Sequence, residues 1–325
     1  MDQNKLLKVK DLRISFPYKK EKLQIVRGID LEVHSGEMIG ILGESGSGKT
    51  VSSTAVLRLF QEADGVVDSG EILYKGRNLL SLSEREMNKI RGKEIAYIFQ
   101  DPTASLNPYR RIGKQMMEAG QIHGIKLTKE IIQQRMVDVG LDQPKVIYNM
   151  YPFQLSGGQC QRIVIAMALL TEPQLIIADE PTNAIDASLR KKILSLLRDI
   201  GIKHGTTMMV ITHDFDVVRF LCSRVVILYG GLIMEEGSIQ EVLERPVHPY
   251  TRELLYCVNS LHNGKSTLYC LEGKPPSPYE FENVCPFYDR CKEREGLCRE
   301  GIPPMVELGE RRARCIHVER HYKEG

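Results

Sequence analysis

One glycine-rich segment limits the possible folds of this chain more than any other feature. Residues 43–50 read Gly-Glu-Ser-Gly-Ser-Gly-Lys-Thr, which fits the pattern G-x-x-x-x-G-K-[ST]. The apolar run at 37–43 predicts a strand that enters this loop, and a helix is predicted to begin near Lys49. A loop of this kind between a strand and a helix binds phosphate groups through inward-pointing backbone N–H groups. The sequence therefore predicts an α/β fold with a phosphate loop (residues 43–50).

The residues of the phosphate loop have separate expected roles. The glycines allow the backbone to wrap closely around phosphates, and the N–H groups act as donors. Lys49 is expected to reach the β- and γ-phosphates of a nucleotide, and the hydroxyl of Thr50 is expected to bind Mg²⁺. The nucleotide-binding residues predicted from this segment are Gly43, Glu44, Ser45, Gly46, Ser47, Gly48, Lys49 and Thr50.

An acidic pair follows a second apolar strand, predicted at 174–179. In Leu-Ile-Ile-Ala-Asp-Glu, four apolar residues lead into Asp179 and Glu180. A Mg²⁺-dependent ATPase needs carboxylates at such a strand end. Asp179 would position the metal, and Glu180 would polarise the attacking water. The pair therefore predicts ATP hydrolysis.

Strands and helices alternate along the first 250 residues. Apolar and polar residues alternate at 6–16 and 25–33, which predicts half-buried antiparallel strands. Further strands are predicted at 94–99, 174–179, 206–212, 224–229 and 231–234, and helices at 128–139 (ending at Gly140), 187–200 (ending at Gly201) and from Ser238, with a Ser238–Glu241 capping box, to Pro246. This order indicates a largely parallel α/β sheet with antiparallel strands beside it. Past about residue 250 no clear periodicity is visible, so the main domain boundary is predicted there.

The composition narrows the class of partner. The formal net charge of +2 gives no reason to expect nucleic acid as the main partner. No stretch approaches the roughly 20 apolar residues that cross a bilayer. The first sixteen residues carry charges where a secretory signal needs an apolar region. We therefore expect a cytoplasmic chain that contacts a membrane only through partners.

The segment Leu155-Ser156-Gly157-Gly158-Gln159, here called the signature segment, distinguishes among phosphate-loop ATPases. It resembles the signature sequence of ATP-binding cassette (ABC) ATPases. In that family two cassettes meet head to tail, and the signature of one closes over ATP held by the other. A helix N-terminus with a serine hydroxyl and two glycines suits contact with a γ-phosphate. The resemblance implies that Ser156, Gly157, Gly158 and Gln159 contact nucleotide.

The remaining elements of the ABC family occur in the expected order. Gln100 matches the Q-loop glutamine, which contacts Mg²⁺ and water, and His213 matches the switch histidine, which contacts the γ-phosphate. Residues 183–186 resemble the D-loop, which crosses the dimer interface. Phe16 matches the aromatic residue that stacks on adenine, with Tyr18 as the alternative. The resemblance thus implies that Glu180, His213 and Gln100 are catalytic, and that Thr50, Gln100 and Asp179 hold Mg²⁺.

Two residues depart from the usual family pattern. Cys160 stands where a charged or larger residue usually follows the signature, and Asn183 replaces a more common Thr or Ser. Neither change removes a predicted ligand of phosphate, metal or water. The site is therefore expected to be catalytically competent.

A narrower resemblance extends over the C-terminus. HPYT at 248–251, GKPPSP at 273–278 and CPFYDRC at 285–291 resemble the D-type ATPase of the dipeptide/oligopeptide/nickel permease family. The resemblance implies a second related ATPase, two integral membrane permease subunits and an extracytoplasmic solute-binding protein as partners. It also implies a peripheral location on the cytoplasmic face of the membrane. The expected domains are an ABC nucleotide-binding domain at 1–250, with a helical subdomain at about 101–165, and a C-terminal extension at 251–325.

Four cysteines are grouped in this C-terminal extension: Cys285, Cys291, Cys298 and Cys315. In a cytosolic chain such a group indicates metal more than disulfides. The spacing C-x5-C-x6-C-x16-C lacks the tight pairs of structural zinc sites. Four thiolates from an irregular segment can hold a [4Fe–4S] cluster, and several members of the resembling family do so. A [4Fe–4S] cluster is predicted, with zinc or no metal as alternatives. The other cysteines, Cys160, Cys222, Cys257 and Cys270, are expected to be small buried or incidental apolar residues.

Two other classes of function stay open at this point. An ABC ATPase acting on ribosomes or DNA is the main alternative, and Asn183 favours it slightly. Such proteins usually carry two cassettes or long insertions, which this chain does not have. A cassette that binds ATP only to regulate is the third reading, and the presence of Glu180 and His213 argues against it.

Overall fold

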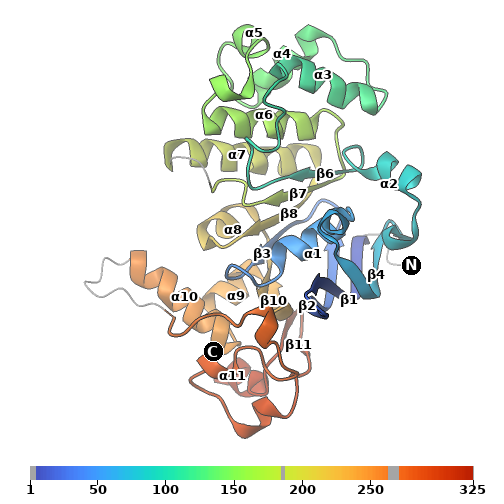
Figure 1. Cartoon of the computed structure of the whole chain (residues 1–325). Coiled ribbons are helices and arrows are strands. Elements are labelled where there is room, and N and C mark those ends of the chain that lie inside the picture. The colour runs from blue at the N-terminus through green and yellow to red at the C-terminus, as the bar shows by residue number, and fades with distance from the viewer. Residues whose placement is uncertain (1–4, 184–186, 263–270, 325) are drawn as a thin grey trace. The chain divides into compact units, whose positions relative to one another are not determined.

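The computed structural model describes residues 5–183, 187–262 and 271–324 (Figure 1). The chain divides into two compact units. The first consists of Met1–Val33, Ile39–Leu80 and Thr212–Gly325, and the second of His34–Met38 and Ser81–Ile211. No helix in the described parts of the chain is long and apolar enough to cross a membrane.

The first unit contains two groups of strands. One sheet has the order β2 (Glu21–His34), β1 (Lys5–Tyr18), β4 (Val66–Tyr74), β5 (Arg77–Asn78). The other group has the order β11 (Val306–Leu308), β12 (Arg311–Ala313), β10 (Leu232–Ser238), β9 (Arg224–Tyr229), β3 (Met38–Leu42). β3 pairs parallel with β9, whereas β9, β10, β12 and β11 pair antiparallel. The strands predicted at 6–16, 25–33, 37–43 and 224–234 are thus confirmed, with a turn at Gly230 and Gly231.

The helices of the first unit are short: α1 (Lys49–Ala55), α8 (Phe215–Leu221), α9 (Ile239–Glu244), α10 (Pro249–His262) and α11 (Val318–Glu324). α8 packs tightly on β3, because a Cβ at Gly40 would collide with Cγ1 of Val218. The hydroxyl of Ser238 accepts a hydrogen bond from the N–H of Glu241 at 3.2 Å, which confirms the predicted start of α9.

The strands near the C-terminus, β11 and β12, continue the sheet of the first unit. Glu235 of β10 lies opposite Ala313 of β12, and Val306 of β11 lies on the far side of Ala313. The expectation of no periodicity past residue 250 was wrong for α10, which continues to His262. Buried residues such as Tyr250 and Leu255 alternate with charged and polar residues along α10. Pro249 occupies the first helical position, where proline is favoured, so both the pattern and the start of this helix were present in the sequence.

A buried carboxylate joins this extension to β10. The side chain of Glu235 is fully buried and accepts hydrogen bonds from the backbone N–H groups of Val247 and His248, each at 3.0 Å. Arg311 of β12, which is 3% exposed, donates to the same carboxylate at 2.8 Å. Glu235 therefore fixes the residues that enter α10 and one strand of the extension.

The second unit has a parallel sheet with the strand order β8 (Thr207–Thr212), β7 (Leu175–Asp179), β6 (Ile95–Ile98). Its helices are α2 (Glu84–Ile90), α3 (Ile112–Ile122), α4 (Lys129–Asp138), α5 (Pro144–Ile147), α6 (Gly157–Leu169) and α7 (Ala187–His204). α3 and α4 pack against α6, and α5 packs against α4 (Figure 1). Four of these helices, α3 to α6, fall between Ile112 and Leu169, and the helical subdomain at about 101–165 stays a prediction.

One predicted helix end in the second unit is wrong. α7 continues past Gly201 to His204, although a glycine at this place usually ends a helix. A Cβ at Gly201 would lie 2.5 Å from Sδ of Met38. Glycine is therefore required at this position by close packing inside the helix, and it does not act as a terminator.

We predict that Glu235→Ala strongly destabilises the C-terminal extension. Removing the carboxylate leaves a buried guanidinium and two buried N–H groups without their acceptor, which costs about 3–5 kcal/mol. Urea unfolding, followed by circular dichroism, measures this loss. The matched control is Glu71→Ala, which removes an exposed ion pair with Lys10 and should cost less than about 1 kcal/mol. Equal losses in the two variants would contradict the anchoring role.

Candidate nucleotide-binding site

The phosphate loop connects β3 to α1 in the first unit, as predicted. Gly46 and Gly48 have φ values of 79° and 94°, which L side chains rarely adopt. A Cβ at Gly43 would collide with the carbonyl oxygen of Leu228 and lie 2.7 Å from Oγ of Ser47. Glycine is required at Gly46 and Gly48 by the backbone conformation of the loop, and at Gly43 by its close packing against β9.

Lys49 lies folded onto the loop. Its ammonium group donates hydrogen bonds to the carbonyl oxygens of Gly43 at 2.7 Å and Glu44 at 2.8 Å. The side chain is largely buried, whereas Ser45, Gly46 and Thr50 are exposed. The loop thus presents backbone and a hydroxyl to solvent with a buried cation behind them, which suits a polyphosphate and a metal ion.

The predicted acidic pair ends β7 in the second unit. All residues of β7 are buried, and Asp179 is 3% exposed. The hydroxyl of Tyr97 on the neighbouring strand β6 donates a hydrogen bond to Oδ2 of Asp179 at 3.1 Å. This contact fixes the orientation of the carboxylate, as a metal-positioning residue requires.

Glu180 has an unusual backbone conformation. Its φ is 48°, in the left-handed region that is costly for residues other than glycine. Its N–H donates to the carbonyl oxygen of Ile211 on β8 at 2.8 Å, and its own carbonyl accepts from Asn183 at 3.2 Å. Strained residues of this kind occur preferentially at functional sites. This conformation, which sequence alone gave no means to see, supports the predicted functional role of Glu180.

Two further predicted catalytic residues follow strand ends and are exposed. Gln100 comes two residues after β6, beside the exposed Phe99. His213 follows β8 directly and precedes Asp214, the N-cap of α8. Because β6 and β7 are parallel, Gln100 and Glu180 follow strands that finish at the same end of the sheet of the second unit, the end at which α/β folds bind ligands. His213 belongs to the first unit. Of the predicted D-loop, Asn183 is exposed, and 184–186 lie outside the described residues.

The signature segment forms the start of α6. Ser156 is the N-cap, and its Oγ accepts from the N–H of Gln159 at 3.3 Å, while Oε1 of Gln159 accepts from the N–H of Ser156 at 2.9 Å. Ser156 and Gly157 are exposed, and Gly158 is buried. The segment is therefore a helix N-terminus at the surface. Cys160, 1% exposed, packs below it, which accounts for a small apolar residue at that position.

The aromatic residues predicted near adenine differ in their surroundings. Phe16 is half-buried, and a Cβ at Gly65 would lie 2.9 Å from its Cε1. Tyr18 is 38% exposed and contacts the ring of Tyr279 edge to face, with the centroids 4.7 Å apart. Tyr279 belongs to the C-terminal extension and was not predicted as part of the site. The ammonium group of Lys19 also lies over the ring of Tyr18, 5.2 Å from its centroid.

Tyr250 and Arg290, from the C-terminal part of the chain, contact the phosphate loop directly, which the sequence did not predict. Arg290 donates to both carboxylate oxygens of Glu44, at 2.6 and 3.1 Å. The N–H of Glu44 donates to the hydroxyl of Tyr250 at 3.2 Å. Tyr250 belongs to the motif HPYT and Arg290 to the motif CPFYDRC. In the sequence these two motifs indicated the family but no contact with the phosphate loop.

The four grouped cysteines are free thiols. Cys285, Cys291 and Cys298 are buried, Cys315 is half-buried, and the N–H of Cys285 donates to the carbonyl oxygen of Cys298 at 3.1 Å. Burial, together with the neighbouring cysteines, raises the pKa of Cys285 to about 11 and that of Cys315 to about 12. Among the residues that the structure describes, no three His, Cys, Asp or Glu side chains are grouped so that they could hold a metal ion. The metal site stays a prediction.

The remaining cysteines are incidental to the site. Cys222 is 7% exposed and, like Cys160, is a buried apolar residue as expected. Cys257 is half-buried in α10. Cys270 lies outside the described residues.

Comparisons with known proteins agree with this geometry. Residues 26–183 match the ABC transporter family, and residues 234–298 match the C-terminal region of oligopeptide/dipeptide transporters. The probable peptide ABC transporter ATP-binding protein y4tR of Sinorhizobium fredii is 42% identical over 93% of this chain and 92% of its own length. The oligopeptide transport ATP-binding protein OppD of Bacillus subtilis is 44% identical over 94% and 87%, respectively.

Solved structures lead to the same family. The dimeric ATP-binding cassette MJ0796 in a post-hydrolysis state, bound to ADP and Pi, is similar with a TM-score of 0.63 and 28% identity. The similarity covers 72% of this chain and 98% of that chain. The fold is therefore that of a phosphate-loop ABC ATPase, with a mixed sheet and helices. The chain belongs to the ABC transporter ATP-binding proteins of the oligopeptide and dipeptide transport family.

Proposed function

We propose that this chain is the ATP-hydrolysing subunit of a membrane importer for peptides or related small solutes. The observation that carries this proposal is the intact phosphate loop in a chain whose similarity to peptide-transport ATP-binding proteins includes the C-terminal extension. The relatives reported above give no support to the alternative of an ABC ATPase acting on ribosomes or DNA.

We assign the following roles to the site residues. Lys49 and the N–H groups of the phosphate loop hold the β- and γ-phosphates. Thr50, Asp179 and Gln100 hold Mg²⁺, which neutralises charge on the phosphates. Glu180 orients and polarises the attacking water, and His213 contacts the γ-phosphate. Phe16 stacks on the adenine.

The proposed partners follow from the signature segment and the family. Ser156, Gly157, Gly158 and Gln159 close over ATP that a second, related ATPase holds, and the phosphate loop of this chain meets the signature of that partner. The two ATPases act beneath two integral membrane permease subunits, on the cytoplasmic face of the membrane. An extracytoplasmic solute-binding protein supplies the cargo, and nucleic acid has no part. The nucleotide-binding domain is placed at 1–250, its helical subdomain at about 101–165 and the extension at 251–325.

We also propose that Cys285, Cys291, Cys298 and Cys315 hold one [4Fe–4S] cluster, with zinc as the alternative. Support comes from four free cysteines, three of them buried, in one segment of the extension. Cys315 packs against a buried apolar group of three residues, Val247, Ala313 and Val318, and the metal cluster would crosslink this part of the segment to the other three cysteines. Its role would be structural.

Glu180→Gln should leave ATP binding unchanged and lower the rate of hydrolysis at least about 100-fold, because the carboxylate that orients and polarises the water is lost. Equilibrium binding of ATP and release of phosphate by the purified complex measure the two effects separately. Near-normal turnover would remove Glu180 from the catalytic role.

Ser156→Asp and Ser156→Asn test the signature as a matched pair. Aspartate and asparagine cap a helix as well as serine does, so α6 should stay intact in both. Only aspartate places a negative charge against the γ-phosphate that the partner holds, so it should block ATPase activity of the complex through like-charge repulsion. ATP binding to the separate subunit should be unchanged in both. Equal activity of the aspartate and asparagine variants would refute contact with the phosphate.

Anaerobic purification followed by iron and acid-labile sulfide analysis tests the cluster. About four iron atoms per chain are expected, and Cys→Ser at any one of the four ligands should release them. Zinc without iron would establish the alternative. Chains without metal would refute both.

A further inference from the structure

Glu44, the second residue of the phosphate loop, is held from three directions. Its backbone oxygen accepts from Lys49 at 2.8 Å and from the N–H of Ser47 at 3.2 Å. Its N–H donates to the hydroxyl of Tyr250 at 3.2 Å. Its carboxylate forms a two-point ion pair with Arg290. The position of Glu44 therefore affects both the loop backbone and the lysine that is to bind phosphate.

Arg290 is itself held in place. Its side chain is 6% exposed. Besides Glu44, Nη1 donates to the hydroxyl of Tyr229 at 3.0 Å, and Nε donates to the carbonyl oxygen of Glu272 at 3.0 Å. Burial alone would lower the pKa of Arg290, but its hydrogen bonds to Glu44 and Tyr229 raise it above the ordinary value. The guanidinium is a fixed positive charge beside the loop.

Tyr250, which accepts the hydrogen bond from the N–H of Glu44, is also held firmly in place. Tyr250 is fully buried against the rings of Tyr229 and Phe287, with centroids 4.4 and 5.3 Å away. Its N–H donates to Nδ1 of His248 at 3.0 Å, and burial lowers the pKa of His248 to about 3, so this histidine is neutral. Phe287 and Arg290 both belong to CPFYDRC. One short motif thus supports both contacts with Glu44.

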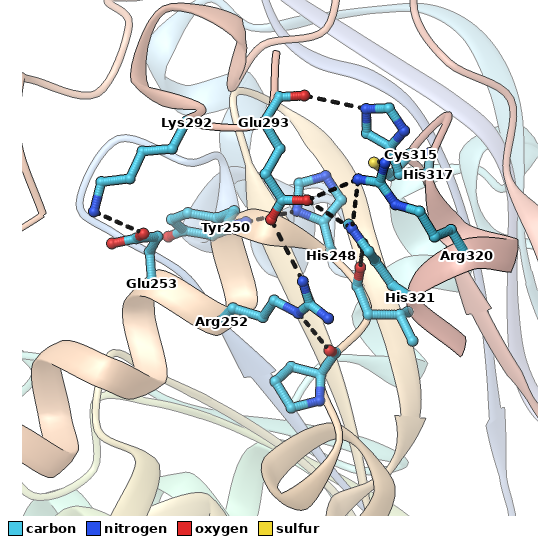
Figure 2. A network of polar contacts seen from close by, with 12 residues as sticks. His248, Tyr250, Arg252, Glu253, Lys292, Glu293, Cys315, His317, Arg320 and His321 are labelled. Atoms are coloured by element: carbon cyan, nitrogen blue, oxygen red, sulfur yellow. Dashed lines mark hydrogen bonds and ion pairs between the residues drawn. The ribbon is translucent and has the colours of Figure 1, made fainter. Parts of the chain in front are cut away.

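A polar network joins these contacts to the rest of the extension (Figure 2). The carboxylate of Glu293, three residues after Arg290, contacts Arg252 of α10 at 3.4 Å and His321 of α11 at 2.7 Å. Lys292 pairs with Glu253 of α10 at 3.0 Å. Arg290 and Tyr250 are therefore carried by elements that are bonded to each other.

We propose that Arg290 is a positioning residue for ATP, and that the C-terminal extension sets the nucleotide affinity of the phosphate loop through it. This inference rests on the proposed binding of ATP to that loop. A carboxylate on the loop repels the phosphates of ATP, and in a partly buried place the repulsion is weakly screened. Arg290 neutralises this charge and holds Glu44 where its backbone oxygen can contact Lys49.

Variants of the full-length chain that change the charge at Arg290 and Glu44 separate this positioning role from simple support of the fold. Arg290→Gln leaves the Glu44 carboxylate uncompensated and should weaken ATP binding about tenfold. In the complex, KM for ATP should rise with kcat nearly unchanged, because no group that reacts is altered. The double variant Arg290→Gln/Glu44→Gln removes the repelling charge as well and should recover most of the affinity. Arg290→Lys keeps the positive charge but loses the two-point geometry. Its affinity for ATP should lie between that of the unaltered chain and that of Arg290→Gln.

Binding of ATP by calorimetry, with thermal melting as the check of folding, provides the measurement. Lys10→Gln is the matched control, since it removes one exposed positive charge, paired with Glu71 in the same unit, and belongs neither to the loop nor to the network that carries Arg290. This variant should bind ATP as the unaltered chain does. Wild-type affinity in Arg290→Gln would overturn the inference, and so would a double variant as weak as the single one. An unaltered chain that binds no ATP would overturn the proposed function instead.

Discussion

The structure depends first on the close approach of the phosphate loop to β9. At Gly43 the loop backbone lies so near the carbonyl oxygen of Leu228 that no side chain fits between them. The carbonyl oxygen of Ser47 accepts from the N–H of Gly231, just after β9, at 3.1 Å, which fixes the loop a second time. Because β9 leads through Gly230 and Gly231 into β10, the strand that supports the loop is continuous with the strand that carries the extension. Loop and extension therefore share one support.

Because of this shared support, residues near the C-terminus contact the phosphate loop directly. Glu235 of β10 fixes the two residues before Pro249, and Tyr250 in the first turn of α10 then reaches Glu44. Arg290 reaches the same residue from the cysteine-containing segment. Whatever stabilises that segment, a metal centre included, also stabilises the ion pair with the loop. The extension thus contributes to the site, although none of its residues belongs to the ATP motifs.

Local features of this chain could be predicted from sequence, and contacts over long separations could not. The phosphate loop and the signature segment are set by glycines, caps and apolar periodicity within a few residues, so their strand, loop and helix were predicted correctly. Gly201 shows the limit of local prediction. Sequence alone does not distinguish a glycine that ends a helix from one required by close packing, and here the packing partner is Met38. Arg290 and Glu44 are 246 positions apart. Neither residue carries a local pattern that indicates the other. The strained φ of Glu180 likewise depends on its bond to β8 and is invisible in sequence.

The geometry of Ser156 shows how one hydroxyl can serve the fold and the chemistry together. As the N-cap of α6, its oxygen accepts a hydrogen bond from Gln159, and this role uses a lone pair. A serine hydroxyl has one proton to donate besides its two acceptor positions. Capping therefore leaves the donor available for an anion at the exposed end of the helix, where backbone N–H groups also point outward. The bond from the N–H of Gln159 holds Oγ of Ser156 in one position, so the proposed contact with phosphate would cost little side-chain entropy.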